Sequence, residues 1–498
     1  MHITLISPYP DITSFGLRTI SAHLRRGGHQ TRLVLLPDPF GDDLKYGITR
    51  YEDRVLDQLV DLCRGTDLVG ITLMTNFFDG AVQVTRRLKA ASGTPVIWGG
   101  VHPTIRPEES LEHADIVCVG DGEEALLELA DKMAAGRDWT GTANLWSRRD
   151  GAIIRNRPRP LTRDLDSYPR PDYSLEDHHI LFEGRLQPLT GEIQKRCLER
   201  GTVSHYLKRT GYQTMTGRGC PHQCTYCVND ALKNLYGASG YLRWRSTAHV
   251  IDELLWVKAN LPYVGFVWIS DDAFFARSSA AIEEFCREYK EKIGLPFSCL
   301  ASPLTVTREK MDALVDAGLV YVQMGIQTGS ARIQELFNRT AMSNERVLQA
   351  ARVINAHKDR MFPPSYDFIL DVPYETEADV VESLRLIARI PKPFQLQPFA
   401  LVLYPGTKLH EMATRDGLVG DERREIYAKS YTMREGNYLN LLITLARGGK
   451  FPGPLLKLLV SDPAVAVLNS RPLRPLFRLL FLSLRAAKKT ARRLAGRS

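Results

Sequence analysis

The sequence predicts an α/β protein that opens with a doubly wound parallel sheet. Over residues 1–140, short apolar runs alternate with segments of helical spacing, and short strands joined by helical crossovers are typical of such sheets. The same alternation returns over residues 211–405, after a stretch rich in proline and charge. With 498 residues, of which 44% are hydrophobic, the chain is long enough for two or three domains.

Apolar runs and helical periodicity locate the elements of the first part. A short buried strand is predicted at residues 3–6, and a helix over Gly16–Arg26 is predicted to end at Gly27 and Gly28. The later strands are predicted at residues 31–36, 68–73, 95–100 and 116–120, and the later helices at 78–91 and 107–112. Ligands of doubly wound sheets bind beyond the carboxyl ends of the strands, so the loops that follow these strands form a candidate site.

Glycines and small polar side chains gather in the loops at that edge, which are Ser7–Pro10, Thr72–Asn76, Gly99–Thr104 and Gly120–Glu124. Glycine lets the backbone come close to a large flat ligand, and the hydroxyl and amide groups offer hydrogen bonds. The candidate ligand-binding residues are Thr72, Thr75, Gly99, Gly100, His102, Gly120, Gly122 and Glu123. His102 has a second interpretation as a turn residue, because it stands before Pro103.

Composition divides the chain into four parts. The runs Arg155–Pro160 and Tyr168–Asp172 are rich in proline and charge and cannot continue a helix, so the segment around them is predicted to be a linker. We expect a first domain over residues 1–140, a linker over 141–205, a second domain over 206–410 and a helical region over 411–498.

The second domain begins with three closely spaced cysteines, Cys220, Cys224 and Cys227. Three thiolates on one short loop can converge on an inorganic centre, and soft sulfur ligands favour iron–sulfur clusters. A [4Fe–4S] cluster held by only three cysteines leaves one iron open to a substrate or cofactor. The alternative is a closed zinc site with His222 as the fourth ligand, although His222 lies inside the loop, where the geometry is cramped.

The spacing Cys220-x3-Cys224-x2-Cys227, with Tyr226 before the last cysteine, resembles the signature of the radical S-adenosylmethionine (SAM) enzymes. The resemblance implies a partial (β/α)6 barrel over residues 206–410, with its catalytic loops at the carboxyl ends of the strands. It also implies a [4Fe–4S] cluster whose open iron chelates SAM. An electron then cleaves SAM to a 5′-deoxyadenosyl radical, so an electron donor such as flavodoxin or ferredoxin is an expected partner.

Two further strand ends are similar to SAM-binding landmarks of that family. The apolar run Val264–Ser270 leads into Asp271 and Asp272, and the resemblance places one of these acids near the SAM amino group. The other interpretation of the acids is a helix N-cap. The run Gly325–Ser330 is similar to the family's GIESGS strand end, with Gln327 in place of a glutamate, so the hydrogen-bonding capacity stays and the charge is lost. The expected SAM-binding residues are Tyr226, Asp271, Asp272, Gln327 and Ser330.

The first domain resembles the cobalamin-binding domain that precedes the radical SAM domain in one large subfamily. The resemblance rests on the loops Gly99–Thr104 and Gly120–Glu123, and it implies cobalamin as a third cofactor. The Asp-x-His-x-x-Gly motif of the other cobalamin-binding type is absent, so a histidine ligand to cobalt from that motif is not expected. The alternative is a retained Rossmann-like scaffold without a corrin, because a fold does not fix a function.

Together these resemblances imply a cobalamin-dependent radical SAM methyltransferase that methylates an unactivated carbon of a small-molecule or lipid substrate. A cyclase or oxidative rearrangement enzyme with the same cofactors is an alternative, and so is a non-catalytic iron–sulfur or cobalamin sensor. Methylthiolation is disfavoured, because the enzymes of that group carry three more cysteines in an upstream domain, whereas the first domain of this chain has only Cys63 and Cys118.

The positive net charge of +8 originates in the C-terminal tail. Residues 471–498 hold nine Lys and Arg and no acidic residue, which leaves the remaining body near −1 and predicts no nucleic-acid-binding face. Leucines and alanines of the tail recur at helical spacing, with basic residues on another side, as is typical of a membrane-surface anchor. The alternative is a tail helix that packs on its own barrel.

Cysteine usage and the N-terminus bear on location. Only three of the eight cysteines cluster, and the others are expected to be buried free thiols, which fits a reducing cytoplasm. The chain starts with a strand instead of a basic and apolar leader, and no apolar run approaches the roughly 20 residues of a spanning helix. We expect a cytoplasmic protein, peripheral on the inner face of the membrane if the tail is an anchor.

Overall fold

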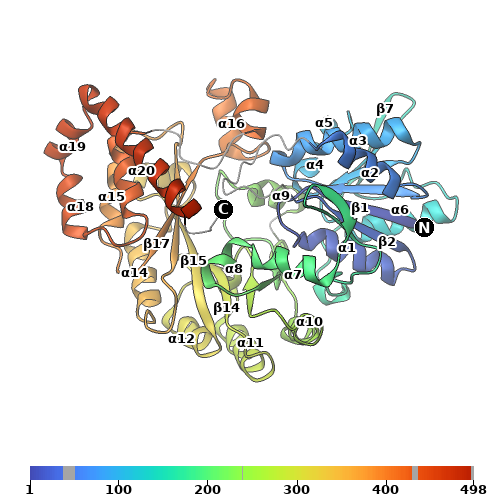
Figure 1. Ribbon diagram of the computed structural model, residues 1–498, viewed down its shortest axis with the longest axis horizontal. Coiled ribbons are helices and arrows are strands. Elements are labelled where there is room, and N and C mark those ends of the chain that lie inside the picture. Colours follow the sequence, from blue (N-terminus) through green and yellow to red (C-terminus); the bar gives the residue numbers. More distant parts are fainter. Residues whose placement is uncertain (38–50, 238, 429–435, 495–498) are drawn as a thin grey trace.

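The protein, described from a computed structural model, consists of two α/β sheets that lie next to one another, followed by a group of C-terminal helices (Figure 1). The structure describes residues 1–37, 51–237, 239–428 and 436–494. In Figure 1 the N-terminal sheet is blue, the second sheet runs from green to orange, and the C-terminal helices are red. The predicted α/β class is confirmed.

The first sheet has a parallel centre with helices on both faces. Its described strands lie in the order β7-β6-β5-β4-β3-β1-β2-β8-β9. The parallel centre consists of β1 (His2–Ser7), β2 (Gln30–Leu35), β3 (Leu68–Thr72), β4 (Val96–Gly99) and β5 (Ile116–Cys118), and β8 adds a further parallel pairing to β2. The helices between them are α1 (Phe15–Arg26), α2 (Asp53–Leu62), α3 (Phe78–Ala91), α4 (Val101–Ile105), α5 (Pro107–Ser110) and α6 (Glu123–Ala134). The strands are buried on both faces, as expected for parallel strands covered by helices.

Residues 141–205, which the sequence predicts to be a linker, contribute two hairpins to the edges of this sheet. They are β6 (Leu145–Arg149) with β7 (Ala152–Arg155), and β8 (His179–Phe182) with β9 (Arg185–Pro188). The turns Asp150-Gly151 and Glu183-Gly184 have positive φ at both residues, which matches the twist of a two-residue hairpin. The strands β6, β7 and β9 are short and only partly apolar, and the apolar run in β8 is only four residues long, so the sequence pattern does not reveal the hairpins. The helices α7 (Gly191–Glu199) and α8 (Thr202–Leu207) follow.

The second sheet forms a partial barrel of parallel strands in sequence order. The described strands are β10 (Gly211–Thr214), β13 (Phe266–Ile269), β14 (Phe297–Ala301), β15 (Leu319–Gln327), β16 (Ser365–Leu370) and β17 (Gln395–Ala400). The helices are α9 (Val228–Tyr236), α10 (Thr247–Asn260), α11 (Ser279–Lys292), α12 (Arg308–Asp316), α13 (Ala331–Leu336), α14 (Asn344–Asn355) and α15 (Glu377–Ile387). The short strands β11 (Gly217–Arg218) and β12 (Arg243–Trp244) pair with each other as a separate antiparallel two-stranded sheet. Because all strands run the same way, their carboxyl ends share one edge.

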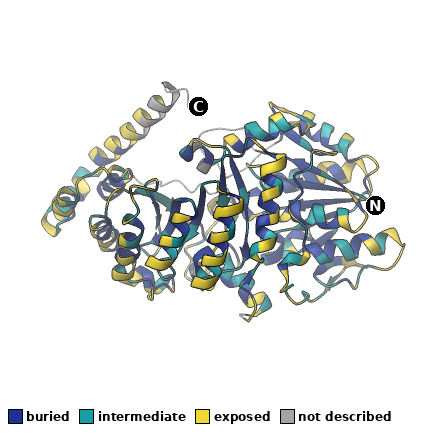
Figure 2. Cartoon of the chain, turned by 90° about the horizontal axis from the view of Figure 1, so that it is seen from below, coloured by how far each residue is buried: buried dark blue, intermediate teal, exposed yellow. Residues whose placement is uncertain are grey.

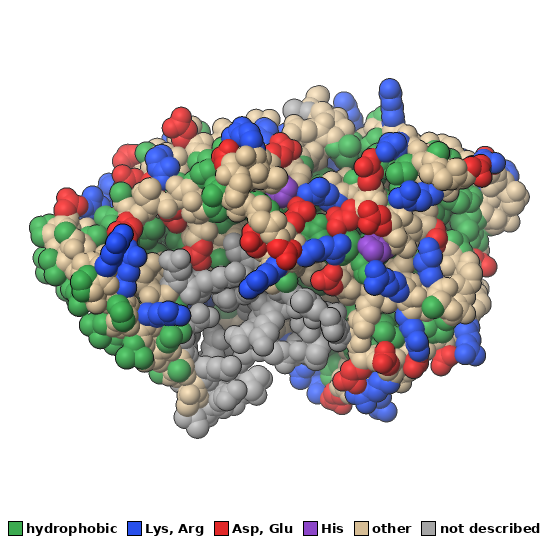
Figure 3. Space-filling model, turned by 90° about the horizontal axis from the view of Figure 1, so that it is seen from above, with side chains coloured by type: hydrophobic (Ala, Val, Ile, Leu, Met, Phe, Trp, Pro, Cys, Tyr) green, Lys and Arg blue, Asp and Glu red, His purple; other side chains and the backbone are tan. Residues whose placement is uncertain are grey.

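The main core lies between this second sheet and its helices. Alternate strand residues such as Val267, Val322 and Phe368 are buried in it, while the residues between them face the interior of the partial barrel. In Figure 2 the strands are dark blue and the outer helix faces yellow. The C-terminal helices α17 (Tyr438–Ala446), α18 (Gly453–Leu459), α19 (Asp462–Leu468) and α20 (Arg474–Leu494) extend this core. The helix α16 (Lys408–Arg415) packs instead into the core that includes the N-terminal sheet. Green apolar side chains gather on the surface at the end of the molecule that carries α18–α20 (Figure 3).

Candidate active site

The three predicted cluster ligands lie on the loop that leads from β11 into α9. Gly219 has a φ of +92°, and a Cβ added there would come within 2.5 Å of the Tyr241 carbonyl oxygen, so the loop needs glycine directly before Cys220. Cys224 is buried, whereas Cys220 and Cys227 are half-buried. Cys220 and Cys227 are therefore the two more accessible cysteines of the loop.

Hydrogen bonds to neighbouring elements fix the backbone of the cysteine loop. The Lys233 ammonium on α9 donates to the carbonyl oxygens of Pro221 and His222 at 3.2 and 2.7 Å. The Thr225 hydroxyl donates to the Leu336 carbonyl at the end of α13 at 2.7 Å. Elements on either side of the loop thus hold the spacing of the cysteines without any ligand.

The thiols lie close enough to affect one another's ionisation. Burial raises the pKa of Cys220 to about 11 and that of Cys227 to about 12, and the neighbouring cysteines of the loop add to both shifts. Burial lowers the pKa of His222 to about 4, which keeps its imidazole neutral. Thiols of this kind ionise when a metal compensates the charge. In the part of the chain that the structure describes, no group of three His, Cys, Asp or Glu is arranged to hold a single metal ion. The donor set of three soft sulfurs on one loop fits a cluster, in which each sulfur binds a different iron.

Arg339 connects the cysteine loop to β15, and sequence reasoning missed it. Its guanidinium lies 3.4 Å from the Cys224 sulfur and 3.4 Å from the Tyr226 hydroxyl, and it donates to the Gly325 carbonyl at 2.7 Å. The residue is only 6% exposed. A buried cation beside a thiolate stabilises the negative charge that a reduced cluster accumulates. A single arginine after a short helix carries no periodicity or spacing that would single it out.

The two acids after β13 have different surroundings. Asp271 is buried and accepts hydrogen bonds from the Thr216 backbone N–H and hydroxyl, each at 2.5 Å, and burial raises its pKa to about 6. Asp272 accepts one hydrogen bond, from Asn229 at 3.1 Å, and keeps a solvent-exposed surface. Protein atoms around the Asp272 carboxyl still raise its pKa, and its charge reaches Cys220 and Cys227. Asp272 is thus the acid that can receive a ligand.

The predicted residues at the end of β15 separate into an accessible one and a buried one. Gln327 has a φ of +76° and lies at a register shift between β15 and β16, with its amide 2.5 Å from where a Gly325 side chain would begin. It is partly accessible. Ser330 is fully buried, donates to Asp379 at 2.6 Å and caps α13. In this arrangement the Ser330 hydroxyl serves the fold, while the Gln327 amide is available to a ligand.

A polar pair on the inner side of β15 and β16 was also missed. Asp367 accepts two contacts from the Gln323 amide nitrogen at 3.0 and 2.8 Å, and burial raises its pKa to about 7. Asp367 pairs in register with Gly325, whose carbonyl oxygen accepts the hydrogen bond from Arg339. A polar residue within each of two otherwise apolar strands is a sequence signal that could have found them.

The strand-end loops of the first domain provide a cradle at β3 and β4. Gly100 has a φ of +98°, and a Cβ there would meet the Leu73 carbonyl and the Thr72 hydroxyl, each at 2.9 Å. The Thr72 hydroxyl lies 3.4 Å from the Tyr9 hydroxyl of the loop after β1. Gly99 ends β4, and Met74, in the loop that follows β3, is 38% exposed. Glycine backbone, hydroxyls and an exposed thioether at one sheet edge fit a large, flat ligand such as a corrin.

His102 and Thr75 lie deeper than the cradle. The His102 ring is fully buried, with Nδ1 3.2 Å from the Thr75 hydroxyl and with Phe78 and Tyr427 packed against it. Burial lowers the His102 pKa to about 3, so the ring is neutral. These contacts give both residues a structural role, and a direct contact with a cofactor stays a prediction.

The Gly120–Glu124 loop contacts the second domain. The Tyr236 hydroxyl on α9 lies 1.6 Å from where a Gly120 Cβ would be, so only glycine leaves room for this contact. Glu123 is 3% exposed and forms an ion pair with Arg218 of β11 at 2.5 Å. Gly122 directly precedes α6. This loop joins the first domain to the hairpin that carries the cysteines.

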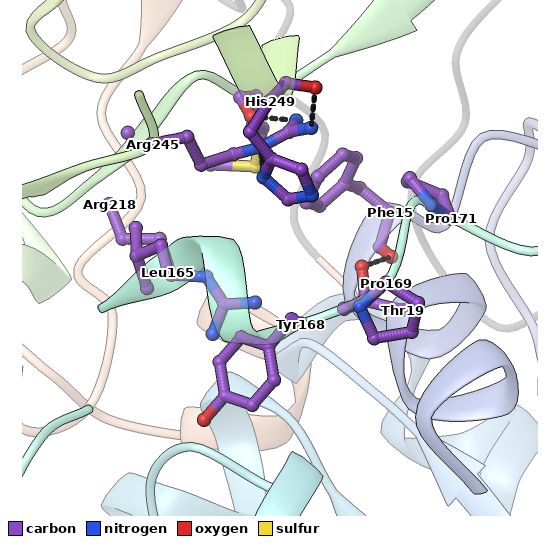
Figure 4. Close-up of a pocket in the computed structure, with 11 residues that line it drawn as sticks. Phe15, Thr19, Leu165, Tyr168, Pro169, Pro171, Arg218, Arg245 and His249 are labelled. Carbon is purple, nitrogen blue, oxygen red and sulfur yellow. Dashed lines mark hydrogen bonds between the residues drawn. The ribbon is translucent and has the colours of Figure 1, made fainter. Parts of the chain in front are cut away.

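A pocket between the domains lies next to this contact (Figure 4). Its walls come from α1, from the segment Leu165–Pro171 and from the start of the cysteine hairpin, including Arg218. On one of its walls, Arg245 donates to His249 through Nε at 3.1 Å. None of the three clustered cysteines lines this pocket, so it belongs to the contact between the domains and not to the cluster site.

Comparisons with known proteins identify both domains. Residues 1–130 match the B12 binding domain, and residues 214–387 match the radical SAM superfamily. The chain is 26% identical to an uncharacterized methyltransferase of Pyrococcus horikoshii, over 71% of this chain and 70% of the relative. It is 23% identical to bacteriochlorophyllide d C-8(2)-methyltransferase of Chlorobaculum tepidum, over 72% and 71%.

Two solved structures share the fold. The radical SAM methyltransferase TsrM from Kitasatospora setae, solved with tryptophan and a SAM analogue, has a TM-score of 0.63 at 18% identity and covers 83% of this chain and 76% of its own. The cobalamin-dependent radical enzyme OxsB, solved with aqua-cobalamin and SAM, has a TM-score of 0.64 at 15% identity over 86% and 64%.

The cysteine loop on a parallel partial barrel and the match of residues 214–387 define a radical SAM enzyme. The B12-binding domain over residues 1–130 places it more narrowly, among the cobalamin-dependent radical SAM enzymes. Its cofactors are a [4Fe–4S] cluster, SAM and cobalamin, and it requires a substrate and a reductant. Within the described ranges we find no helix long and apolar enough to cross a membrane.

Proposed function

We propose that this enzyme transfers a methyl group from SAM to an unactivated carbon of a small-molecule or lipid substrate. The observation that carries the proposal is the contact between the strand-end loops of the two domains. Arg218, two residues before Cys220, pairs with Glu123 at 2.5 Å, and the Tyr404 hydroxyl after β17 donates to Asn76 after β3 at 2.8 Å. A methyl carrier and a radical source bound at these two edges can reach the same substrate.

When bound, the cluster supplies an electron, SAM supplies a radical and a methyl group, and cobalamin carries that methyl group. The chain's own residues position and enclose these groups. The thiolates of Cys220, Cys224 and Cys227 would hold the cluster. The Asp272 carboxylate accepts hydrogen bonds from an ammonium group, and the Gln327 amide binds SAM without adding a charge.

Asp367 is the residue we propose to hold or move a proton within the barrel. Its pKa of about 7 lets it act as a hydrogen-bond acceptor or donor near neutral pH. Gln323 keeps its carboxyl oriented toward the barrel interior. We propose a flavodoxin or ferredoxin as the electron donor.

A cyclase is the second candidate, because the comparisons also include one. The chain is 23% identical to an anaerobic magnesium-protoporphyrin IX monomethyl ester cyclase of Synechocystis, over 50% of this chain and 43% of the relative. The two activities differ in their products. Methyl transfer converts SAM to S-adenosylhomocysteine as well as 5′-deoxyadenosine, whereas cyclisation yields no S-adenosylhomocysteine.

The test uses full-length protein, reconstituted anaerobically with iron, sulfide and cobalamin, then reduced and given SAM with a labelled methyl group. We expect labelled methylcobalamin and S-adenosylhomocysteine, together with 5′-deoxyadenosine. Cys224→Ala is expected to lose the cluster and 5′-deoxyadenosine, whereas Cys286→Ala, at a buried cysteine of α11, keeps both. Formation of 5′-deoxyadenosine without any label on cobalamin would favour the cyclase, and neither product would contradict both.

A further inference from the structure

The C-terminal helices expose more large apolar side chains than any other part of the described chain. Of fifteen exposed large hydrophobic residues, eight lie on α18, α19 and α20. We call them the apolar patch, and they are Leu455, Leu458, Val467, Leu476, Leu479, Leu480, Leu482 and Leu484, each 40–66% exposed. Isolated exposed leucines are normal on a protein surface, whereas a contiguous group marks an interaction site. Figure 3 shows these green side chains at one end of the molecule, with blue ones among them.

The helix α20 packs against the protein through a different face. Phe477 and Phe481 are 9% and 2% exposed, and the Phe477 ring lies 4.9 Å from the Tyr438 ring of α17. Leu479 and Leu482, between and beside them, are 64% and 51% exposed. A helix that only packed on its own barrel would bury its leucines as well as its phenylalanines. In Figure 2 the helix extends away from the body of the molecule.

The charge of this region identifies the kind of surface that the patch fits. Residues 436–498 contain twelve Lys and Arg and one Asp, a net charge of +11, so the rest of the chain carries −3 of the total of +8. Leucines combined with clustered cations bind anionic lipid, because the apolar groups enter the acyl boundary and the cations meet the phosphates. Two copies of the region facing one another would instead bring like charges together.

We propose that the apolar patch docks the enzyme on an anionic lipid surface, with α20 lying in the plane of the interface. No described helix qualifies as a membrane span, so the contact is peripheral. The helices that carry the patch pack on barrel helices, because α18 contacts α15 and α20 contacts α17. The proposal does not depend on which reaction the enzyme performs.

The test is flotation of the full-length protein with vesicles of phosphatidylcholine, either alone or with phosphatidylglycerol as about a third of the lipid. We expect binding to the mixed vesicles, which falls at about 0.5 M salt because the charges are screened. The variant Leu479→Glu/Leu482→Glu is expected to bind about tenfold more weakly, because it places acids on the apolar face. Both positions are exposed, so the variant should keep its fold, which circular dichroism checks.

The matched control is Leu255→Glu, at a 43% exposed leucine of α10, which should bind like the wild type.

Three outcomes would overturn the proposal. The wild type could fail to float with anionic vesicles, or the control could lose binding as much as the patch variant. The third is a dimer, seen by light scattering, that the patch variant dissociates while vesicle binding is absent; the patch would then be an interface between two copies.

Discussion

At the scale of single residues, the two acids after β13 have separable roles. Asp272 is solvent-exposed and makes one hydrogen bond to Asn229, so Asp272→Asn should leave the fold intact. Loss of a charge-assisted hydrogen bond to the SAM ammonium should weaken SAM binding about tenfold or more. Equilibrium dialysis of cluster-loaded protein with SAM measures this. Unchanged SAM affinity would remove Asp272 from the site.

Asp271 should instead matter for stability. Its folded pKa of about 6 lies above the ordinary value of 3.8, so the folded state holds the proton more tightly than the unfolded state. The resulting stabilisation is present below about pH 4 and is lost as the pH rises through about 6. The Asp271→Asn side chain does not titrate. The unfolding free energy of the wild type minus that of the variant should therefore decrease as the pH rises from about 4 to about 6. Urea unfolding at several pH values checks this, and a constant difference would contradict it.

Arg339 should tune the cluster more than it stabilises the fold. Arg339→Gln removes the cation 3.4 Å from the Cys224 sulfur, which should make the cluster's reduction potential more negative by some tens of mV, on the order of one hydrogen bond to sulfur. Redox titration followed by electron paramagnetic resonance measures the potential. The control is Arg332→Gln on α13, whose side chain is 52% exposed and pairs with Asp379. An equal shift in both variants would argue against a local effect.

At the scale of elements, strand-end glycines govern how closely the domains approach. Gly120→Ala places a Cβ 1.6 Å from the Tyr236 hydroxyl at a φ of +90°, so it should destabilise the protein by about 2–4 kcal/mol through overpacking and strain. Gly136→Ala is the matched control, because Gly136 also has positive φ but open space around it, and it should cost about 1 kcal/mol. Thermal unfolding of both variants tests this, and equal losses would show that only the backbone conformation matters.

The elements also explain what the sequence could and could not predict. The buried strands β1, β3 and β13 were predicted because each is an apolar run in the sequence. The cysteine loop was predicted because its three cysteines lie within eight residues of one another. The hairpins at residues 145–155 and 179–188 were missed, because β6 combines two apolar residues with serine and two arginines, β8 is an apolar run of only four residues, and both strands are placed by the sheet they join. Arg339 was missed for a related reason. Its importance arises from a contact between distant segments, because 115 residues separate it from Cys224.

At the scale of the whole molecule, buried charges join the two cofactor domains. Arg218 pairs with Glu123 at 2.5 Å and approaches Asp121 at 3.4 Å, and Arg243 reaches Asp121 at 3.1 Å. The side chains of Glu123 and Arg243 are 3% and 5% exposed. Because Arg218 lies two residues before Cys220, this network connects the B12-binding domain directly to the cluster loop.

The network should determine whether radical formation and methyl transfer are coupled. Arg218→Gln leaves Glu123 as an unpaired buried charge, which should cost about 3–5 kcal/mol, whereas Arg218→Met/Glu123→Met removes both charges and should recover most of that loss. The exposed pair Lys290–Asp316 serves as control, because Lys290→Gln should change stability by less than about 1 kcal/mol.

The double variant folds without the ionic contact, so its cluster can still form 5′-deoxyadenosine, while methyl transfer to substrate should fall because the domains are held less firmly. The ratio of S-adenosylhomocysteine to 5′-deoxyadenosine measures this coupling. An unchanged ratio in a stable double variant would mean that the other interdomain contacts, such as Tyr404 with Asn76, are enough to align the two cofactors.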